Sequence, residues 1–320
     1  MNTAPHQATP PASSRPYVAW IGLGAIGSPM ARCAAEAGLP VTAFDLNPEA
    51  RQALADVATP ASTARDAARG ADVVVVMVAT PAQLDAVLFG EGGIAEVLTA
   101  STTLLIMSTV GPAAIEQTAA ALASITEHVV DAPVSGGAAR AATGDLLVMV
   151  GGAEADVAAV RPLLDALASN APVVGPRPGD GQRFKIVNQL LCGVHIVAAG
   201  EALALADAMG LDLQQVHEVL GTGAAASFMF GDRGQRMVDG TFDDVRSALT
   251  IFVKDMGLVA EAAREVDQDV PLAASAAQVY QRGSELGWDR RDDSIVYRVL
   301  RGKAEAPSDQ PTRKESPGLA

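Results

Sequence analysis

Cysteine is scarce in this sequence, which excludes two common ways of stabilising a chain. Only Cys33 and Cys192 occur among 320 residues, and both stand in apolar segments with a helical pattern. Two thiols have neither the number nor the spacing of a disulfide framework or of a structural zinc site. We therefore expect both cysteines to be small buried residues.

Basic residues are also few. The chain has 23 Lys and Arg against 37 Asp and Glu, which gives a net charge of -14 at pH 7. Binding to a phosphate backbone depends mostly on clustered Lys and Arg, so no nucleic-acid partner is expected. An anionic metabolite is not excluded, because a few cations and backbone donors can converge within a cleft.

Long apolar runs are absent as well. The longest, 73–79, is far shorter than the roughly 20 residues that a membrane-spanning helix requires, so we predict no membrane span. Residues 1–15 are rich in Pro, Ala, Ser and Thr and lack the apolar block of a secretory signal. We interpret them as a disordered tail and expect a cytoplasmic location.

Candidate metal ligands do not cluster either, so we predict no metal site. The histidines, which have no spacing typical of metal ligation, are His6, His128, His195 and His217. His195 is interpreted as a buried histidine satisfied by hydrogen bonds. The pairs Asp243-Asp244 and Asp292-Asp293 precede helical runs, and we interpret them as helix caps and solvated charge.

What the chain does have is enough apolar material to fill a large core. It is 49% hydrophobic and 19% charged, and its length favours two domains. Strand and helix patterns alternate through the first half, which predicts a parallel doubly wound sheet. The expected strands are 17–21, 41–44, 72–78, 103–107, 128–132, 146–150 and 172–174, with helices from about Pro48, after Pro81 and over 154–168.

The second half carries helical patterns only. A helix over 181–209 is apolar on nearly every side, and such a helix must be surrounded by protein. Further helices are expected over 213–220, 224–233, 246–266, 271–286 and 292–301. We thus predict an α/β fold with an N-terminal doubly wound Rossmann-type sheet domain, 16–179, an all-α domain, 180–302, and a disordered tail, 303–320.

The segment from Tyr17 to Asp45 predicts a dinucleotide site. An apolar strand leads into Gly22-Leu23-Gly24-Ala25-Ile26-Gly27 and then into a helical pattern. The glycines permit a tight turn, close approach of a pyrophosphate and packing of helix on strand, while the helix start offers free N–H groups. Asp45 ends the next strand, 23 residues after Gly22. A carboxylate there accepts the ribose hydroxyls of NAD and repels the additional phosphate of NADP, so NAD is the expected cofactor.

Two polar residues on the long apolar helix are candidates for chemistry. Lys185 and Asn188 are three residues apart, so at about 3.6 residues per turn they point within about 60° of each other and can share a site. Burial disfavours the charged form of a lysine, which suits it to proton transfer. A lysine near a helix start can also simply extend to solvent, so the pair alone does not decide its role.

Four motifs occur in a fixed order along the chain. They are Gly22 to Ala31 (GLGAIGSPMA), Asp131 to Gly137 (DAPVSGG), Gly181 to Gln189 (GQRFKIVNQ) and Lys254-Asp255. This set resembles the 3-hydroxyisobutyrate dehydrogenase, or β-hydroxyacid dehydrogenase, family, and the match runs over residues 18–301. The resemblance implies an NAD-dependent oxidoreductase of small hydroxyacids that assembles as a homodimer or homotetramer through its helical domain.

The resemblance also implies roles for the residues that match the substrate motifs. Lys185 would be the catalytic acid or base, and Asn188 would orient both that lysine and the substrate. Ser135, Gly136 and Gly137 would hold the substrate carboxylate, a role that suits a glycine loop with free N–H groups. The competing interpretation of Ser135 to Gly137 is a simple turn.

Further positions match the cofactor side of the family's site. Thr109 would lie against the nicotinamide ribose, Val78 and Ala79 would line the cofactor, and Lys254 would close over cofactor and substrate. Lys254 could instead be half of a solvated charge pair, but the apolar residues before it favour partial burial. The sequence departs from the family at Ile106, where an acidic residue is usual, and this leaves the support of Thr109 open.

The substrate is suggested by the finer resemblance. Segments 187–196, 227–230, 251–255 and 291–294 resemble the L-threonate dehydrogenase branch, whose members oxidise a four-carbon sugar acid at C2. Residues 227–232 would then line the far end of the pocket, where a polyol chain needs hydrogen bonds. A hydroxyacid dehydrogenase of the 3-hydroxyisobutyrate or tartronate semialdehyde type stays open, as do an imine reductase and a noncatalytic NAD sensor, which both tend to lack the lysine. The stereoisomer, the direction and the subunit number are also open.

Overall fold

The structure is a computed structural model, and it describes residues 15–302. Within them the chain divides into two compact units. The first unit extends to Leu191 and includes Lys254–Ala273, and the second comprises Cys192–Val253 and the chain from Ala274 onward. The predicted domain ranges, 16–179 and 180–302, stay predictions. The predicted tails lie outside the described residues, apart from Arg15.

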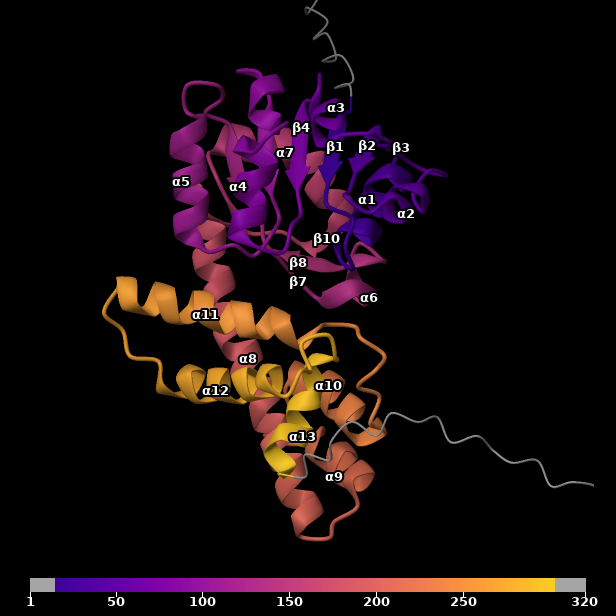
Figure 1. The fold of residues 1–320 in the computed structure, drawn as a ribbon, viewed down its shortest axis with the longest axis vertical. Helices are drawn as coiled ribbons and strands as arrows, with labels where there is room; N and C mark the ends of the chain where they lie inside the picture. The colour runs from indigo at the N-terminus through magenta and orange to yellow at the C-terminus, as the bar shows by residue number, and fades with distance from the viewer. Residues whose placement is uncertain (1–14, 303–320) are drawn as a thin grey trace, which may run out of the picture. The chain divides into compact units, whose positions relative to one another are not determined.

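The first unit contains an eight-stranded sheet, coloured indigo to magenta in Figure 1. Its strand order is β11-β9-β6-β5-β4-β1-β2-β3, and every neighbouring pair is parallel except β6 with β9. The predicted doubly wound sheet is therefore confirmed, with one antiparallel pair. The strands are β1 (Val18–Ile21), β2 (Val41–Phe44), β3 (Thr59–Pro60), β4 (Val73–Val76), β5 (Thr103–Ile106), β6 (Val129–Asp131), β9 (Val150–Gly151) and β11 (Val173–Gly175).

A second, three-stranded sheet has the order β10-β8-β7. Its strands are β7 (Val134–Ser135), β8 (Leu146–Val148) and β10 (Ala168–Asn170). The prediction of one strand over 146–150 is wrong, because the chain changes sheets within that range. Met149 stands between β8 and β9, and its N–H donates to the carbonyl oxygen of Pro133 at 3.1 Å.

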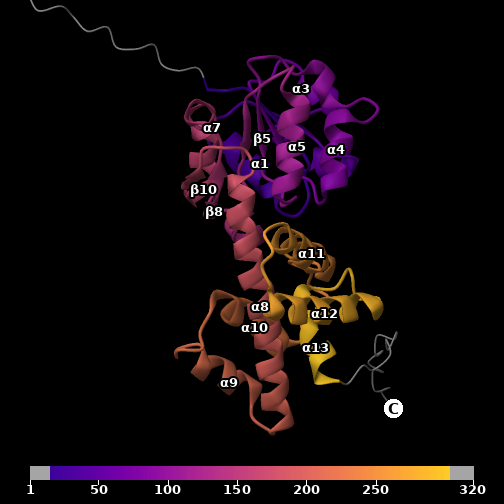
Figure 2. The same cartoon turned by 90° about the vertical axis from the view of Figure 1, so that its left-hand side faces the viewer.

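Helices cover both faces of the large sheet because its strands send alternate side chains to opposite sides. Trp20 faces the core that α1 and α7 cover, and Ile21 faces the core that α3, α4 and α5 cover. Figure 2 shows these two helical layers on opposite sides of the strands. The helices are α1 (Gly27–Glu36), α2 (Pro48–Gln52), α3 (Ala64–Ala68), α4 (Pro81–Phe89), η1 (Ile94–Val97), α5 (Pro112–Leu122), α6 (Gly137–Ala141) and α7 (Glu154–Leu167).

Helix α5 is missing from the sequence prediction, although its start is marked. Gly111 has a φ of 85°, and Pro112 occupies the first helical turn. A glycine at positive φ is a turn signal, and proline at the first helical position is a start signal. The small apolar residues of 112–122 have only a weak amphipathic pattern, which is why the periodicity did not reveal the helix.

The second unit is helical, as predicted. It holds α9 (Leu213–Leu220), α10 (Phe228–Asp239), η2 (Asp293–Ile295) and α13 (Val296–Arg301), with parts of α8 (Asp180–Ala208), α11 (Leu249–Glu265) and α12 (Pro271–Glu285). Phe252 stacks on Tyr280 in its core, with ring centroids 5.2 Å apart. Helix α10 begins later than predicted because Ser227 caps it, with Oγ accepting the N–H of Phe230.

Helix α8 is not surrounded by protein, contrary to the expectation from its composition. Phe184, Val187 and Leu191 are 53%, 62% and 50% exposed, and Leu205 is 62% exposed. Among the described residues it is also the one helix long and apolar enough to cross a membrane, with 44% of its most apolar window buried. That is weak evidence for a membrane span, because a core helix of a soluble protein has the same length and composition.

Candidate active site

The glycine turn after β1 has the geometry that the sequence predicts. Gly22 has a φ of 102°, and a Cβ atom there would meet the carbonyl oxygen of Met77 at 2.1 Å. A Cβ atom on Gly27 would meet the carbonyl oxygen of Gly22 at 2.2 Å, so α1 packs against the turn only without one. A Cβ atom on Gly24 would meet no protein atom within 4 Å. This open side of the turn, at the start of α1, suits a pyrophosphate.

Asp45 follows β2 beside this turn and already holds two backbone amides. Its Oδ2 accepts the N–H of Leu23 at 2.7 Å, and its Oδ1 accepts the N–H of Asn47 at 2.8 Å. Arg51 donates to the carbonyl oxygen of Asp45 at 2.9 Å, and its guanidinium lies over the ring of Phe44. Asp45 therefore fixes the turn as well as presenting a carboxylate at the carboxyl edge of the sheet.

The chain after β4 and β5 lies at the same edge. The N–H of Val78 donates to Ser108 Oγ at 2.7 Å, and the N–H of Ala79 donates to Gln83 Oε1 at 2.8 Å. Ser108 precedes Thr109, so the hydroxyl of Ser108 joins the two predicted cofactor segments. In doubly wound folds, dinucleotides bind at this carboxyl edge of parallel strands.

Asp131, the last residue of β6, anchors the beginning of α8. It is fully buried, and its two oxygens accept the N–H groups of Gly179 and Gln182, each at 2.7 Å. Burial raises the pKa of Asp131 to about 7, against the opposing effect of hydrogen bonds from Gly179, Gln182 and Gly181. By accepting these N–H groups, the carboxyl group of Asp131 caps the N-terminus of α8 from outside the helix.

The substrate residues predicted from the sequence gather near this helix start. Lys185 is 6% exposed on α8, one turn before Asn188. Ser135 Oγ donates to Asn188 Oδ1 at 3.4 Å, which connects the end of β7 to the helix. Gly136 and Gly137 have φ values of 142° and 74°, which L side chains rarely adopt.

A chain of polar contacts extends from Asn188 to α11. Asn188 Nδ2 donates to Gln189 Oε1 at 2.8 Å, and Gln189 Nε2 donates to Asp255 Oδ2. Asp255 is 2% exposed, and its other oxygen lies 2.9 Å from Lys254 Nζ. Lys254 Nζ also donates to the carbonyl oxygen of Thr109 at 2.6 Å. The predicted partial burial of Lys254 is confirmed, since its side chain is 24% exposed.

The structure adds residues that the sequence did not single out as site residues. Asp131, Gln182, Gln189 and Asp255 are all buried, and each connects two predicted site segments. Gln189 was visible as a polar exception on an apolar helix, but its partner was not. Hydrogen bonds between residues more than 50 positions apart leave no periodic signal in the sequence.

Several predictions for other polar residues are wrong. His195 is exposed rather than buried, and the cysteines are half-buried rather than buried. Asp292 caps η2, as predicted, but neither Asp292 nor Asp293 is solvated, because both are fully buried against Arg236 and Arg233. Within residues 15–302, no group of three or more His, Cys, Asp or Glu side chains could hold a metal ion.

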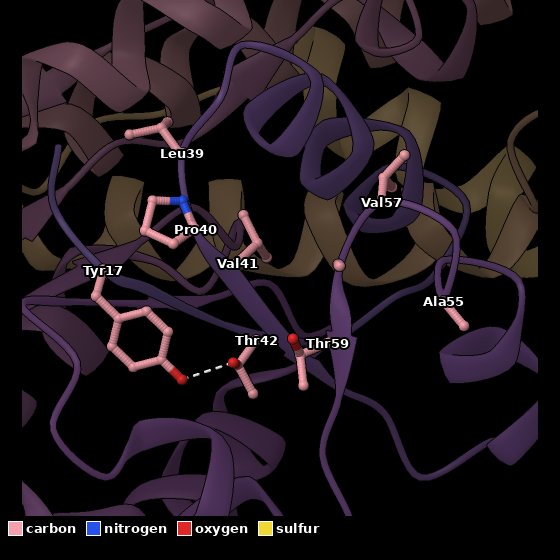
Figure 3. A pocket seen from close by; sticks show the side chains of 9 residues that line it. Tyr17, Leu39, Pro40, Val41, Thr42, Ala55, Val57 and Thr59 are labelled. Atoms are coloured by element: carbon pink, nitrogen blue, oxygen red, sulfur yellow. Dashed lines mark hydrogen bonds between the residues drawn. The ribbon is translucent and has the colours of Figure 1, made fainter.

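An open cavity of about 330 Å³ lies away from these residues (Figure 3). Tyr17, Pro40 and Val57, from the chain before β1, β2 and β3, belong to its lining, which places it at the amino edge of the sheet. The hydroxyls of Tyr17 and Thr42 are hydrogen-bonded to each other at 2.6 Å. The lining carries no charged side chain. This cavity is therefore at the opposite edge from the candidate active site.

Two family models together match nearly the whole chain. The model of the NAD binding domain of 6-phosphogluconate dehydrogenase matches residues 17–175. The model described as NAD-binding of NADP-dependent 3-hydroxyisobutyrate dehydrogenase matches residues 179–300. The strand-containing first part of the chain and the helical second part are thus each matched by a model of a nicotinamide-dependent dehydrogenase.

Individual relatives agree with these models. L-threonate dehydrogenase of Escherichia coli is 38% identical over 288 residues, which cover 89% of this chain and 95% of that protein. The 2-hydroxy-3-oxopropionate reductase of Escherichia coli is 32% identical over 88% of this chain and 96% of its own. The crystal structure of 3-hydroxyisobutyrate dehydrogenase from Salmonella typhimurium is 40% identical, with a TM-score of 0.82 over 88% of this chain and 99% of that chain.

Proposed function

Because the chain belongs to the 3-hydroxyisobutyrate dehydrogenase family of nicotinamide-dependent oxidoreductases, we propose that it oxidises a small hydroxyacid, with L-threonate oxidised at C2 as its preferred reaction. The observation that carries the proposal is the contact chain from Ser135 to Thr109. It joins residues from three of the four motifs to Thr109, which follows β5. The identity with L-threonate dehydrogenase over 89% of the chain supports the choice of substrate.

Lys185 is the proposed proton acceptor. The hydroxyl proton of the substrate would pass to the neutral amine of Lys185. The hydrogen on the carbon that bears this hydroxyl would leave with its electron pair as hydride, and the C=O bond would form. Bound NAD supplies the nicotinamide ring that receives this hydride. In the reverse direction the ammonium group of Lys185 returns the proton to the carbonyl oxygen. Burial of Lys185 at 6% exposure supports this role, because water cannot readily compete for the proton.

The remaining site residues would bind and orient the substrate. The turn at Gly136 and Gly137 can point backbone N–H groups at a carboxylate, and Ser135 adds a hydroxyl donor. Asn188 stands one helical turn from Lys185 and shares a hydrogen bond with Ser135, so it can orient substrate and lysine together. Lys254, held at the carbonyl oxygen of Thr109, would place a positive charge over cofactor and substrate.

NAD is the proposed form of the cofactor, with Asp45 as the selecting residue. Asp45→Ala is expected to weaken NAD binding more than NADP binding, because the ribose hydroxyls lose an acceptor while the repulsion of the additional phosphate disappears. Steady-state kinetics with both cofactors measures the ratio of the two kcat/KM values. Asp45→Asn, which keeps one oxygen for the N–H of Leu23, separates lost charge from a collapsed turn. An unchanged ratio in both variants would place ribose recognition elsewhere.

A substrate panel tests the proposed function directly. NADH production would be measured with L-threonate, D-threonate, 3-hydroxyisobutyrate and glycerate, and kcat/KM is expected to be highest for L-threonate. A preference for glycerate, the reduced form of tartronate semialdehyde, would favour the runner-up that the 2-hydroxy-3-oxopropionate reductase relative suggests. NAD binding without turnover of any acid would contradict the enzymatic proposal and favour a sensor.

We also propose that the chain assembles with copies of itself. Exposed apolar side chains recur at helical spacing on α8, at Phe184, Val187, Leu191 and Leu205, and a row of this kind favours burial against another surface. Sedimentation at micromolar concentration is expected to give a species heavier than the 32.6 kDa chain. A homodimer or homotetramer in the cytoplasm is the proposed form, and a stable monomer would contradict it.

A further inference from the structure

We propose that Gln182 is a positioning residue that fixes the loop after β5 against α8, so that Thr109 and Lys185 keep a set separation. This inference rests on the proposed function for the roles of Thr109 and Lys185. The loop comprises residues 107–111, between β5 and α5. Gln182 does not itself reach the reacting atoms in this proposal, since it acts through the backbone of the loop and through its place on α8.

The side chain of Gln182 uses both ends of its amide on this loop. Its Oε1 accepts the N–H groups of Val110 and Gly111, each at 3.1 Å. Its Nε2 donates to the carbonyl oxygen of Ser108 at 2.9 Å. Gln182 has no exposed surface, so water cannot replace these three bonds if the side chain is removed. The three bonds flank Thr109 on both sides and fix the position of its backbone.

The backbone of Gln182 is held from the opposite side. Its N–H donates to Asp131 Oδ2 at 2.7 Å, and the same carboxylate accepts the N–H of Gly179. Residue 182 therefore connects the end of β6, the loop after β5 and the first turn of α8. Lys185 stands one helical turn further on, about 4.5 Å along the axis from residue 182. A rigid turn transmits the position of the loop to the lysine.

The side chain at the end of β5 gives the loop no hydrogen bond, because position 106 is an isoleucine. An acidic side chain at this position could accept hydrogen bonds from the loop. Ile106 is instead fully buried in the apolar core on the face that α3, α4 and α5 cover. Lys254 supplies a bond to the carbonyl oxygen of Thr109, and Ser108 Oγ contacts the carbonyl oxygen of Val76 at 3.3 Å. Lys254 reaches the helix that carries Lys185 only indirectly, through Asp255 and Gln189, whereas Gln182 bonds the loop to that helix directly.

The test is Gln182→Met, which keeps the length and volume of the side chain and removes all three bonds to the loop. In single-turnover experiments with saturating NAD and a substrate of the wild type, the rate of hydride transfer is expected to fall about 10²-fold, the scale of a displacement of about 1 Å. The affinity for NADH is expected to fall about tenfold because the loop must become ordered on binding. The affinity for ADP, which does not extend to the nicotinamide ribose, is expected to stay unchanged.

Thr126→Val is the matched control. Thr126 is also buried, at 2% exposed, and it joins the amino ends of β5 and β6 by donating to the carbonyl oxygen of Thr102 and accepting the N–H of His128. This variant should lower thermal stability without changing the hydride-transfer rate or the binding ratio of NADH to ADP.

A purely structural role for Gln182 would overturn the proposal. In that case Gln182→Met would behave as Thr126→Val does, with lower thermal stability and an unchanged hydride-transfer rate. An equal loss of affinity for NADH and for ADP would overturn the proposal as well. These affinities can be measured even if the wild type oxidises no hydroxyacid. A failure of the proposed function would instead show as absent turnover in the wild type, so it can be told apart from a failure of the Gln182 proposal.

Discussion

Lys185→Ala is expected to lower kcat by about 10² to 10⁴, the usual range for loss of a positioned proton-transfer group. Cofactor affinity should change little, because the proposed cofactor residues lie on the glycine turn, on the chain after β2, β4 and β5, and at Lys254 on α11, and none lies on α8. The backbone of α8 should be retained, since Asp131 and Gln182 hold its first turn independently of the lysine side chain. Steady-state turnover and NADH binding would be measured on the same preparation.

Two further variants make this prediction specific. Lys185→Arg keeps the positive charge but cannot give up its proton at a usable pH, so it should remain as slow as alanine. Lys185→Met keeps most of the apolar stem and should also be slow, which separates lost chemistry from lost packing. Turnover of Lys185→Ala within a fewfold of the wild type would show that another group transfers the proton. We would then look first at Lys254, the other lysine of the contact chain.

Arg233→Met is expected to destabilise the second unit by about 3–5 kcal/mol, because it leaves a buried carboxylate without its counter-charge. Arg233 donates to both oxygens of Asp293, at 3.1 Å from Nε and 3.2 Å from Nη2. Asp293 is fully buried, and this burial raises its pKa while Arg233 opposes the rise. Unfolding by urea, followed by circular dichroism, measures the change in free energy.

The double variant Arg233→Met/Asp293→Asn identifies the cause. It removes the unpaired charge as well, and should recover a large part of the lost stability. Arg246→Met is the matched control, since Arg246 pairs with Asp244 at the surface with a side chain 57% exposed, and loss of such a pair costs about 0–1 kcal/mol. Equal effects of Arg233→Met and Arg246→Met would mean that the buried pair contributes no more than a surface pair.

The sheet was predictable because its local signals agree with one another. Val73–Val76 is apolar at every position and buried on both faces, and glycine, proline or capping signals mark most of the connections. The glycine turn and Asp45 were predictable for the same reason, since strand, turn, helix and acid follow at short, fixed spacing. The short elements were not, because β7 (Val134–Ser135) and β10 (Ala168–Asn170) are defined by partners rather than by their own pattern.

The parts of the site that sequence could not predict are those held by distant partners. Asp255 was interpreted only as half of a charge pair, yet Gln189 reaches it from 66 positions away in the chain. Asp292 and Asp293 were expected in solvent because the adjacent sequence gives no sign that Arg233 and Arg236 are their partners. Burial of a charge depends on tertiary pairing, whereas a local pattern can indicate only a cap.

The dual bonding of Asp45 has a consequence for how coenzyme preference could evolve. One carboxylate fastens the turn after β1 and the start of the segment leading into α2, through the amides of Leu23 and Asn47. With Asp45 as the proposed selecting residue, a substitution that removes the carboxylate to admit the phosphorylated coenzyme removes at least one of those anchors in the same mutational step. A single substitution at Asp45 would therefore change the coenzyme preference at the cost of a less stable turn. A second substitution nearby would be needed to restore that stability.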